Sequence, residues 1–85
     1  MLVTSTAEVV LPETILKADY AQILICSNGF FNVRKNFKWG YIDSQGKELT
    51  SFKYDCPADF EGGFALVRYN REFFYLDENG TESTI

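Results

Sequence analysis

The fold class is decided by residues 64–80, which read FALVRYNREFFYLDENG. An apolar and aromatic run fills residues 64–69 and ends at Asn70-Arg71, a pair typical of turns. A second aromatic run follows at residues 73–76, and residues 77–80 again have the composition of a turn. Two short strands joined by a tight connection predict a β-hairpin here.

The same pattern occurs twice in the chain. Shifted by 34 positions, residues 20–51 align without a gap on residues 54–85, and 11 of the 32 pairs are identical. The identical pairs are Tyr20–Tyr54, Gly29–Gly63, Phe30–Phe64, Val33–Val67, Arg34–Arg68, Asn36–Asn70, Tyr41–Tyr75, Asp43–Asp77, Gly46–Gly80, Glu48–Glu82 and Thr50–Thr84. Self-similarity at a fixed period indicates repeated structural units. We therefore expect a single domain, residues 1–85, with an N-terminal segment (1–19), a first unit (20–53) and a second unit (54–85).

The first unit predicts further strands by the same pattern. Strands are expected at residues 7–11, 21–26, 30–34 and 38–42, with a turn at Lys35-Asn36; residues 47–52 can add a third short strand to this unit, and residues 13–20 a turn or two of helix. We predict an all-β protein of two antiparallel β-hairpin repeats. Its six or seven short strands form a meander curled over one aromatic core, as a small curled sheet, a sandwich or a partly open barrel.

Composition excludes several classes of function. The chain has 85 residues, a net charge of −4 and no histidine, so it cannot build a Ser-His-Asp or Cys-His nucleophile. Two cysteines, Cys26 and Cys56, are too few for a four-cysteine zinc site. We expect them to be half-buried apolar thiols, and a disulfide between them is the alternative. Enzyme activity, a cofactor and a metal ion are therefore not expected. The acidic charge disfavours nucleic acid and anionic membranes as partners. Without a signal peptide or a membrane helix, a cytoplasmic location is expected.

Residues 38–47, KWGYIDSQGK, resemble the signature of the WG repeat (also called the KWG repeat) of bacterial proteins. The continuation at Tyr54-Asp55 and residues 60–67 is similar to the family's downstream pattern. The second unit departs from it, with Phe73-Phe74 where the family has Trp-Gly, and Phe31 stands where Ala is usual. The resemblance implies a β-hairpin repeat fold and a role in protein–protein contact, with no catalytic residues.

The signature residues have structural roles that physical chemistry predicts. Trp39 offers a large apolar face, and Gly40 lets a backbone or a ring approach closely. Asp43 is expected to accept hydrogen bonds from the N–H groups of its own turn, where Gly46 supplies a positive φ. Asp77 and Gly80 should do the same in the second unit.

Two charged regions are candidate contact surfaces. Arg34, Lys35 and Lys38 surround Phe37 and could bind an acidic partner or single-stranded nucleic acid, although an ordinary solvated hairpin tip is the favoured interpretation. Residues 54–85 carry two basic and seven acidic groups, a net charge of −5. That half, which includes Asp55, Asp59 and Glu61, is either a docking surface for a basic protein or a solubilising face. The spacing of Asp55 and Asp59 does not place them in one cleft for acid–base chemistry.

Aromatic residues predict a third surface. Alternate residues of a strand face opposite sides, and in the hairpin of residues 64–76 both sides carry apolar groups, including Tyr69 and Phe74. A protein of two repeat units cannot bury both sides of this hairpin by itself. One side should leave exposed aromatic residues for a partner or a homodimer, unless a simple sandwich covers both.

We therefore expect a non-enzymatic protein-binding module that acts by stoichiometric contact. One version is a general interaction module or homo-oligomer. The alternative is a small dedicated inhibitor, such as an immunity protein or a phage-encoded antagonist of a bacterial nuclease or toxin, with a basic target for its acidic surface. A single-stranded nucleic-acid binder that uses Arg34–Lys38 is a further alternative.

Overall fold

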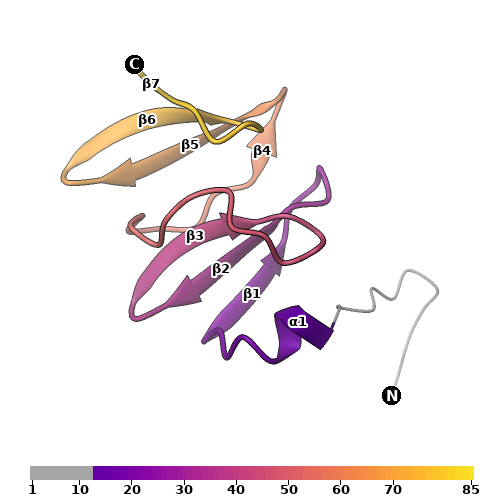
Figure 1. Ribbon diagram of the computed structural model, residues 1–85. Coiled ribbons are helices and arrows are strands. Elements are labelled where there is room, and N and C mark those ends of the chain that lie inside the picture. The colour runs from indigo at the N-terminus through magenta and orange to yellow at the C-terminus, as the bar shows by residue number, and fades with distance from the viewer. Residues whose placement is uncertain (1–12) are drawn as a thin grey trace.

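A computed structural model describes residues 13–85, which form one single-turn helix and seven strands (Figure 1). The helix is α1 (Glu13–Leu16), and the strands are β1 (Gln22–Ile25), β2 (Phe31–Lys35), β3 (Lys38–Ile42), β4 (Phe60–Glu61), β5 (Phe64–Tyr69), β6 (Glu72–Asp77) and β7 (Glu82–Thr84). The strands make two antiparallel sheets, β1-β2-β3 and β4-β5-β6-β7, and the two do not close into a barrel. The predicted all-β fold is thus confirmed. The strand expected at residues 7–11 lies outside the described residues.

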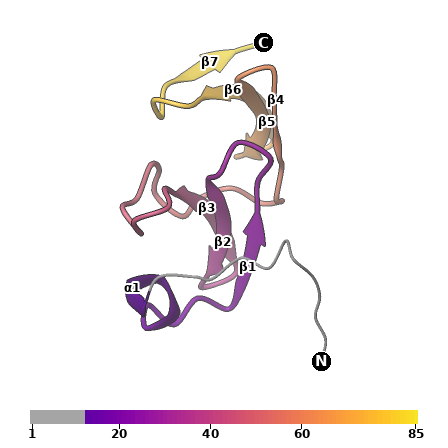
Figure 2. The same ribbon diagram turned by 90° about the vertical axis from the view of Figure 1, so that its right-hand side faces the viewer.

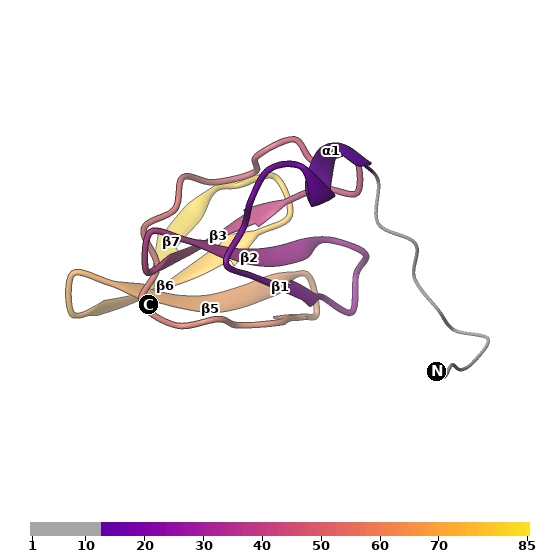
Figure 3. The same cartoon turned by 90° about the horizontal axis from the view of Figure 1, so that it is seen from below.

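The sheets are stacked one above the other, with α1 against the far side of the first sheet (Figures 1 and 2). Viewed from below, their strands run in similar directions, and the β2–β3 and β5–β6 tips lie on the same side (Figure 3). The part of the chain from residue 13 to 85 contains no helix that is long and apolar enough to span a membrane.

Both hairpins turn on two residues with positive φ. Asn36 and Phe37 have φ of 54° and 69°, and Asn70 and Arg71 have φ of 57° and 68°. A two-residue connection with both residues left-handed is a type I′ turn, which matches the twist of paired strands, and Asn tolerates this conformation well. The predicted turn at Lys35-Asn36 was one residue early, because Lys35 still pairs with Lys38.

The third strand expected at residues 47–52 is wrong. Only Glu48 makes a bridge there, with Ile42. The N–H groups of Leu49 and Thr50 both point to the Tyr41 carbonyl, at 2.8 and 3.4 Å, so the chain turns across the sheet edge instead of extending along it. Short strands β4 and β7, which the pattern did not predict, build the second sheet.

One aromatic core was expected, but the buried residues form two clusters. The cluster between the sheets contains Cys26, Trp39, Tyr41, Tyr54, Phe60, Ala65, Val67 and Leu76. The other lies behind the first sheet and contains Ile15, Phe31, Val33 and Ile42, with Tyr20, Ile23 and Phe52 packed against it. The first sheet is therefore covered on both faces, because the alternate residues of β2 and β3 enter different clusters.

Candidate functional site

The second sheet has one covered face and one open face. Ala65, Val67 and Leu76 point toward the first sheet and are buried. The residues between them in β5 and β6, with one from β7, point away: Phe64, Leu66, Arg68, Phe73, Tyr75 and Ser83, which we call the outer face. Its four large apolar side chains are 42–50% exposed. Figure 2 shows this sheet at the end of the stack opposite α1. An exposed aromatic face is therefore present. Tyr69 and Phe74, which the sequence analysis named for it, lie instead on the covered face and pack against the core between the sheets.

The outer face is a continuous surface rather than scattered residues. Leu66 lies opposite Tyr75 across the strands, and Arg68 lies opposite Phe73. The rings of Phe64 and Tyr75 meet edge to face at 6.2 Å, and the Arg68 guanidinium lies 5.6 Å from the Phe73 ring centre. A shallow hollow of about 420 Å³ lies between Phe64, Tyr75 and Ser83. Such a surface can bury apolar groups of a partner.

The 34-residue repeat shows what the outer face corresponds to. The counterparts of Phe64, Phe73 and Tyr75 in the first unit are Phe30, Trp39 and Tyr41. Trp39 and Tyr41 are only 6% and 0% exposed, because the second sheet covers them, and Phe30 packs against the same cluster. The outer face is thus the equivalent of a surface that is buried against a β-sheet elsewhere in the same chain.

The Trp39-Gly40 pair has the structural role expected of it. A Cβ atom at Gly40 would lie 3.0 Å from the Ser51 carbonyl oxygen and 3.0 Å from the Phe52 ring. Glycine therefore makes room for residues 43–59, the crossing segment, which joins β3 to β4 and passes behind β3 at Ser51 and Phe52. Sequence reasoning expected this close approach of backbone or ring.

The turn aspartates behave alike in both units. Asp43 Oδ1 accepts hydrogen bonds from the N–H groups of Gln45 and Lys47, both at 2.9 Å. Asp77 Oδ1 accepts from Asn79 and Thr81 at the same distance. Each turn also has a glycine with positive φ, 90° at Gly46 and 88° at Gly80. These residues fix the conformation of the two turns.

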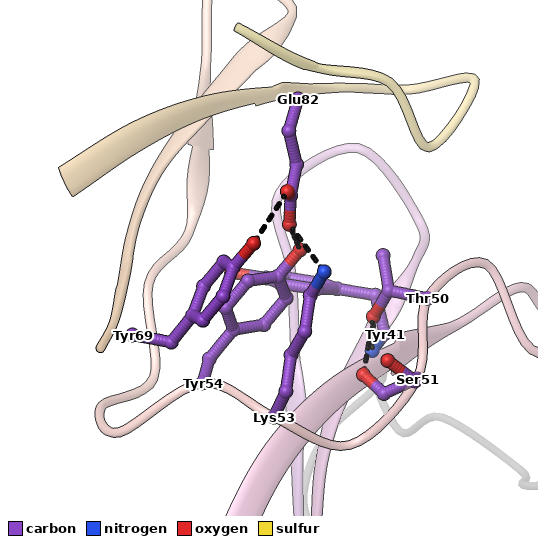
Figure 4. A network of polar contacts seen from close by, with 7 residues as sticks. All are labelled: Tyr41, Thr50, Ser51, Lys53, Tyr54, Tyr69 and Glu82. Atoms are coloured by element: carbon purple, nitrogen blue, oxygen red, sulfur yellow. Dashed lines mark hydrogen bonds and ion pairs between the residues drawn. The ribbon is translucent and has the colours of Figure 1, made fainter. Parts of the chain in front are cut away.

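Glu82 is the centre of a polar network that sequence reasoning missed (Figure 4). Its carboxylate accepts hydrogen bonds from the Tyr54 and Tyr69 hydroxyls and pairs with Lys53 at 3.0 Å. Partial burial opposes ionisation, but the Tyr54 and Lys53 contacts outweigh it and lower the pKa of Glu82. Burial and the hydrogen bond to Glu82 raise the pKa of Tyr54. The network ties β7 to the segment between the sheets. The only sign of this network in the sequence was that Glu82 and Tyr54 are identical to their counterparts in the first unit, Glu48 and Tyr20.

The structure divides the basic cluster of the first hairpin. Lys38 forms an ion pair with Asp55 at 2.6 Å. The Arg34 side chain is half-buried, with its Nε atom shielded from solvent. Lys35 and Phe37 remain exposed at the tip, where Phe37 is 86% exposed.

The acidic candidates are also separated. Asp59 Oδ1 accepts hydrogen bonds from the backbone N–H groups of Ser27 and Phe60, at 2.9 and 2.7 Å, and the bond from Ser27 is the main reason its pKa is lowered. Asp55 is engaged with Lys38, and Glu61 is exposed on β4. Among residues 13–85, no three or more Cys, Asp or Glu side chains are placed to hold a metal ion.

Both cysteines are free thiols, as expected. Cys26 is buried, and Cys56 is exposed, so only the first behaves as an apolar core residue. Burial, followed by the charge of Asp59, raises the pKa of Cys26 to about 11. A thiol with this pKa is protonated at neutral pH and is a poor nucleophile.

Comparison with known families decides the type of repeat. The family described as WG containing repeat matches residues 39–71. Residues 39–71 are thus similar to a WG repeat. The matched region begins at Trp39, follows the crossing segment and ends in the β5–β6 turn, so this region joins the two sheets. No curated protein and no solved structure matches the chain.

Proposed function

We propose that this protein is a non-catalytic protein-binding module whose contact surface is the outer face of the second sheet. One observation carries the proposal. Phe64, Phe73 and Tyr75 are exposed at positions whose counterparts in the first unit are packed against a sheet. An apolar sheet face that is open on one side gains free energy when a partner removes it from water.

The chemistry of the outer face supports contact with protein. Aromatic residues and arginine are enriched at protein–protein interfaces, and charged residues are depleted at their centres. Leu66 and Tyr75 form the apolar middle of the outer face, whereas Arg68 stands at one end. Tyr75 and Arg68 belong to the side-chain types that dominate binding energy in such interfaces.

The alternative function, a small inhibitor that docks on a basic target through its acidic surface, has less support. An inhibitor that docks through its carboxylates needs them free, but Asp55 is paired with Lys38 and Asp59 is held by backbone N–H groups. The centre of the outer face, formed by Leu66 and Tyr75, carries no charge. We therefore place contact on the outer face rather than on the acidic groups.

The test is affinity capture with the full chain. The immobilised wild type, incubated with lysate of the producing cells to which untagged chain has been added, should retain a protein in stoichiometric amount. The double variant Leu66→Ser/Tyr75→Ser should lose it. Phe37→Ser is the matched control, since Phe37 is more exposed but lies at the tip of the other sheet. Retention by the double variant as strong as by the control would contradict the proposal, and so would the absence of any stoichiometric partner.

A further inference from the structure

We propose that the outer face binds the outer face of a second copy of the chain, which gives a symmetric dimer of stacked sheets. This rests on the proposed function, because the same surface is used, and it names the partner. Three features of the molecule support a second copy as the partner: the sheet faces that are free, the difference between the outer face and its repeat counterpart, and the position of its charges.

Among residues 13–85, the outer face is the sheet face with the most exposed large apolar side chains, four against Leu24 and Ile25 on the first sheet. The first sheet turns one face to the second sheet. Its other face, with Phe31, Val33 and Ile42, is covered by Ile15, Tyr20 and Phe52. A second copy as folded therefore cannot offer that face without displacing α1. It can offer its own outer face, which makes the contact self-complementary.

The outer face differs from its counterpart at a decisive position. In the first unit Asn32 is buried and bonds the crossing segment, with its Oδ1 accepting from the Ala58 N–H at 3.0 Å. The corresponding residue of the outer face is Leu66. A further repeat with its own crossing segment would find no polar group there. The outer face of a second copy is apolar at the same place, so Leu66 of one copy would pack against Leu66 and Tyr75 of the other.

Charge fixes the orientation. Glu61 lies opposite Phe64 on β4, at one end of the outer face, and Arg68 lies at the other end. Both side chains are exposed, and neither forms an ion pair within the described residues. A twofold axis near Leu66 reverses the second copy, so that each Arg68 faces the Glu61 of the partner. Opposite charges in register favour this arrangement over a parallel one, in which Arg68 would face Arg68.

The size of the face predicts a weak dimer. Strands β5 and β6 have six residues each in a sheet of four strands. With about 3.3 Å per residue and about 4.8 Å between strands, the face measures at most roughly 20 by 19 Å. Two such faces bury at most roughly 800 Å² in total, about half of the ~1,600 Å² of a standard interface. We expect reversible association in the micromolar range.

The experiment is sedimentation of the full chain over a wide range of concentrations at physiological salt. The wild type should move from the 9.7 kDa of one chain toward twice that mass. Arg68→Glu and Glu61→Arg should each weaken association by roughly tenfold or more, since each places like charges together. An equimolar mixture of these two variants should associate as the wild type does, because every facing pair is again opposite in charge. Circular dichroism of each variant checks that it is folded.

The outcomes separate this inference from the proposed function. A wild type that stays monomeric at all concentrations overturns the dimer, whereas capture of a different protein would still support the module. Association that is not restored in the mixture overturns the symmetric arrangement. Restoration in the mixture, with both single variants monomeric, is the result expected only from a twofold contact through Arg68 and Glu61.

Discussion

A single missing side chain shapes the region that is similar to a WG repeat. Gly40 sits on β3 where the chain later crosses behind it, and the Ser51 carbonyl and Phe52 ring occupy the space that a Cβ atom would need. The neighbouring Trp39 faces the other way, into the core between the sheets. Trp39 thus places a large side chain on one face of β3, and Gly40 leaves space on the other face for the chain that passes behind it. In the second unit Phe74 fills the equivalent side with its own ring, which stacks on Tyr69 at 4.8 Å.

Glu82 makes the stability of the protein depend on pH. Its pKa is lowered in the folded chain from the ordinary 4.5, so its contacts stabilise the protein above that pH. This contribution is lost as the pH falls through the folded pKa. We expect Glu82→Gln to lower the free energy of unfolding at neutral pH by about 1–2 kcal/mol, and to lose less stability than the wild type in acid. Urea denaturation at a series of pH values measures both effects.

The matched control for this change is Glu48→Gln. Glu48 is the counterpart of Glu82 in the first unit, but it is exposed. It should change the free energy of unfolding by less than about 0.5 kcal/mol. Equal effects of the two substitutions would show that the Tyr54–Lys53–Glu82 network contributes no stability of its own.

At the scale of elements, the two hairpins are built by the same rules but have different neighbours. In both units, Asn occupies the first position of positive φ in the hairpin turn, and Asp begins the turn that follows the hairpin. The turn at Gly80 also touches the first unit, since a Cβ atom there would lie 2.9 Å from the Leu49 carbonyl oxygen. This turn therefore joins the sheets as well as closing β6 onto β7.

Two glycines allow this contact to be measured. Gly63 and Gly80 have nearly the same φ, 89° and 88°, but Gly63 has nothing within 4 Å of its Cβ position. Alanine at either position should cost roughly 1–2 kcal/mol in backbone strain. Gly80→Ala should cost about 1–3 kcal/mol more, because the methyl group must push Leu49 away. Thermal unfolding of the two variants gives the difference directly, and equal losses would refute the contact.

Much of this architecture could be predicted, because local signals specify it. The hairpins over residues 30–42 and 64–76 and the Asp43 and Asp77 turns all follow from short stretches of sequence. Strands β4 and β7 could not be predicted, since two or three residues carry no periodicity. The orientation of the second sheet was also undecided, because both of its faces are apolar. Only the first sheet, distant in sequence, determines which face is covered.

At the scale of the whole molecule, the core between the sheets should make them unfold together. Trp39, the one tryptophan of the chain, lies on the first sheet and is covered by the second. Leu76 lies on the second sheet and is fully buried in the same cluster. Leu76→Ala should lower the free energy of unfolding by about 2–5 kcal/mol through loss of buried contacts. A small domain has only ~5–15 kcal/mol in total, so the shift is large.

Two signals recorded on the same samples test this coupling. If the sheets unfold as one unit, Leu76→Ala moves the Trp39 fluorescence transition and the circular dichroism transition to the same lower denaturant concentration. If the second sheet unfolds alone, it uncovers Trp39, so the Trp39 transition moves to lower denaturant concentration. The dichroism then changes in two steps, and the step from the first sheet stays in place. Leu66→Ala is the matched control, because it removes the same atoms from the same sheet on the outer face. Measured at dilution, where the chain is monomeric, it should change stability by less than about 1 kcal/mol, since Leu66 is already 47% exposed. A loss as large as that of Leu76→Ala would mean that the outer face is already covered within one chain, which would contradict its role as a contact surface.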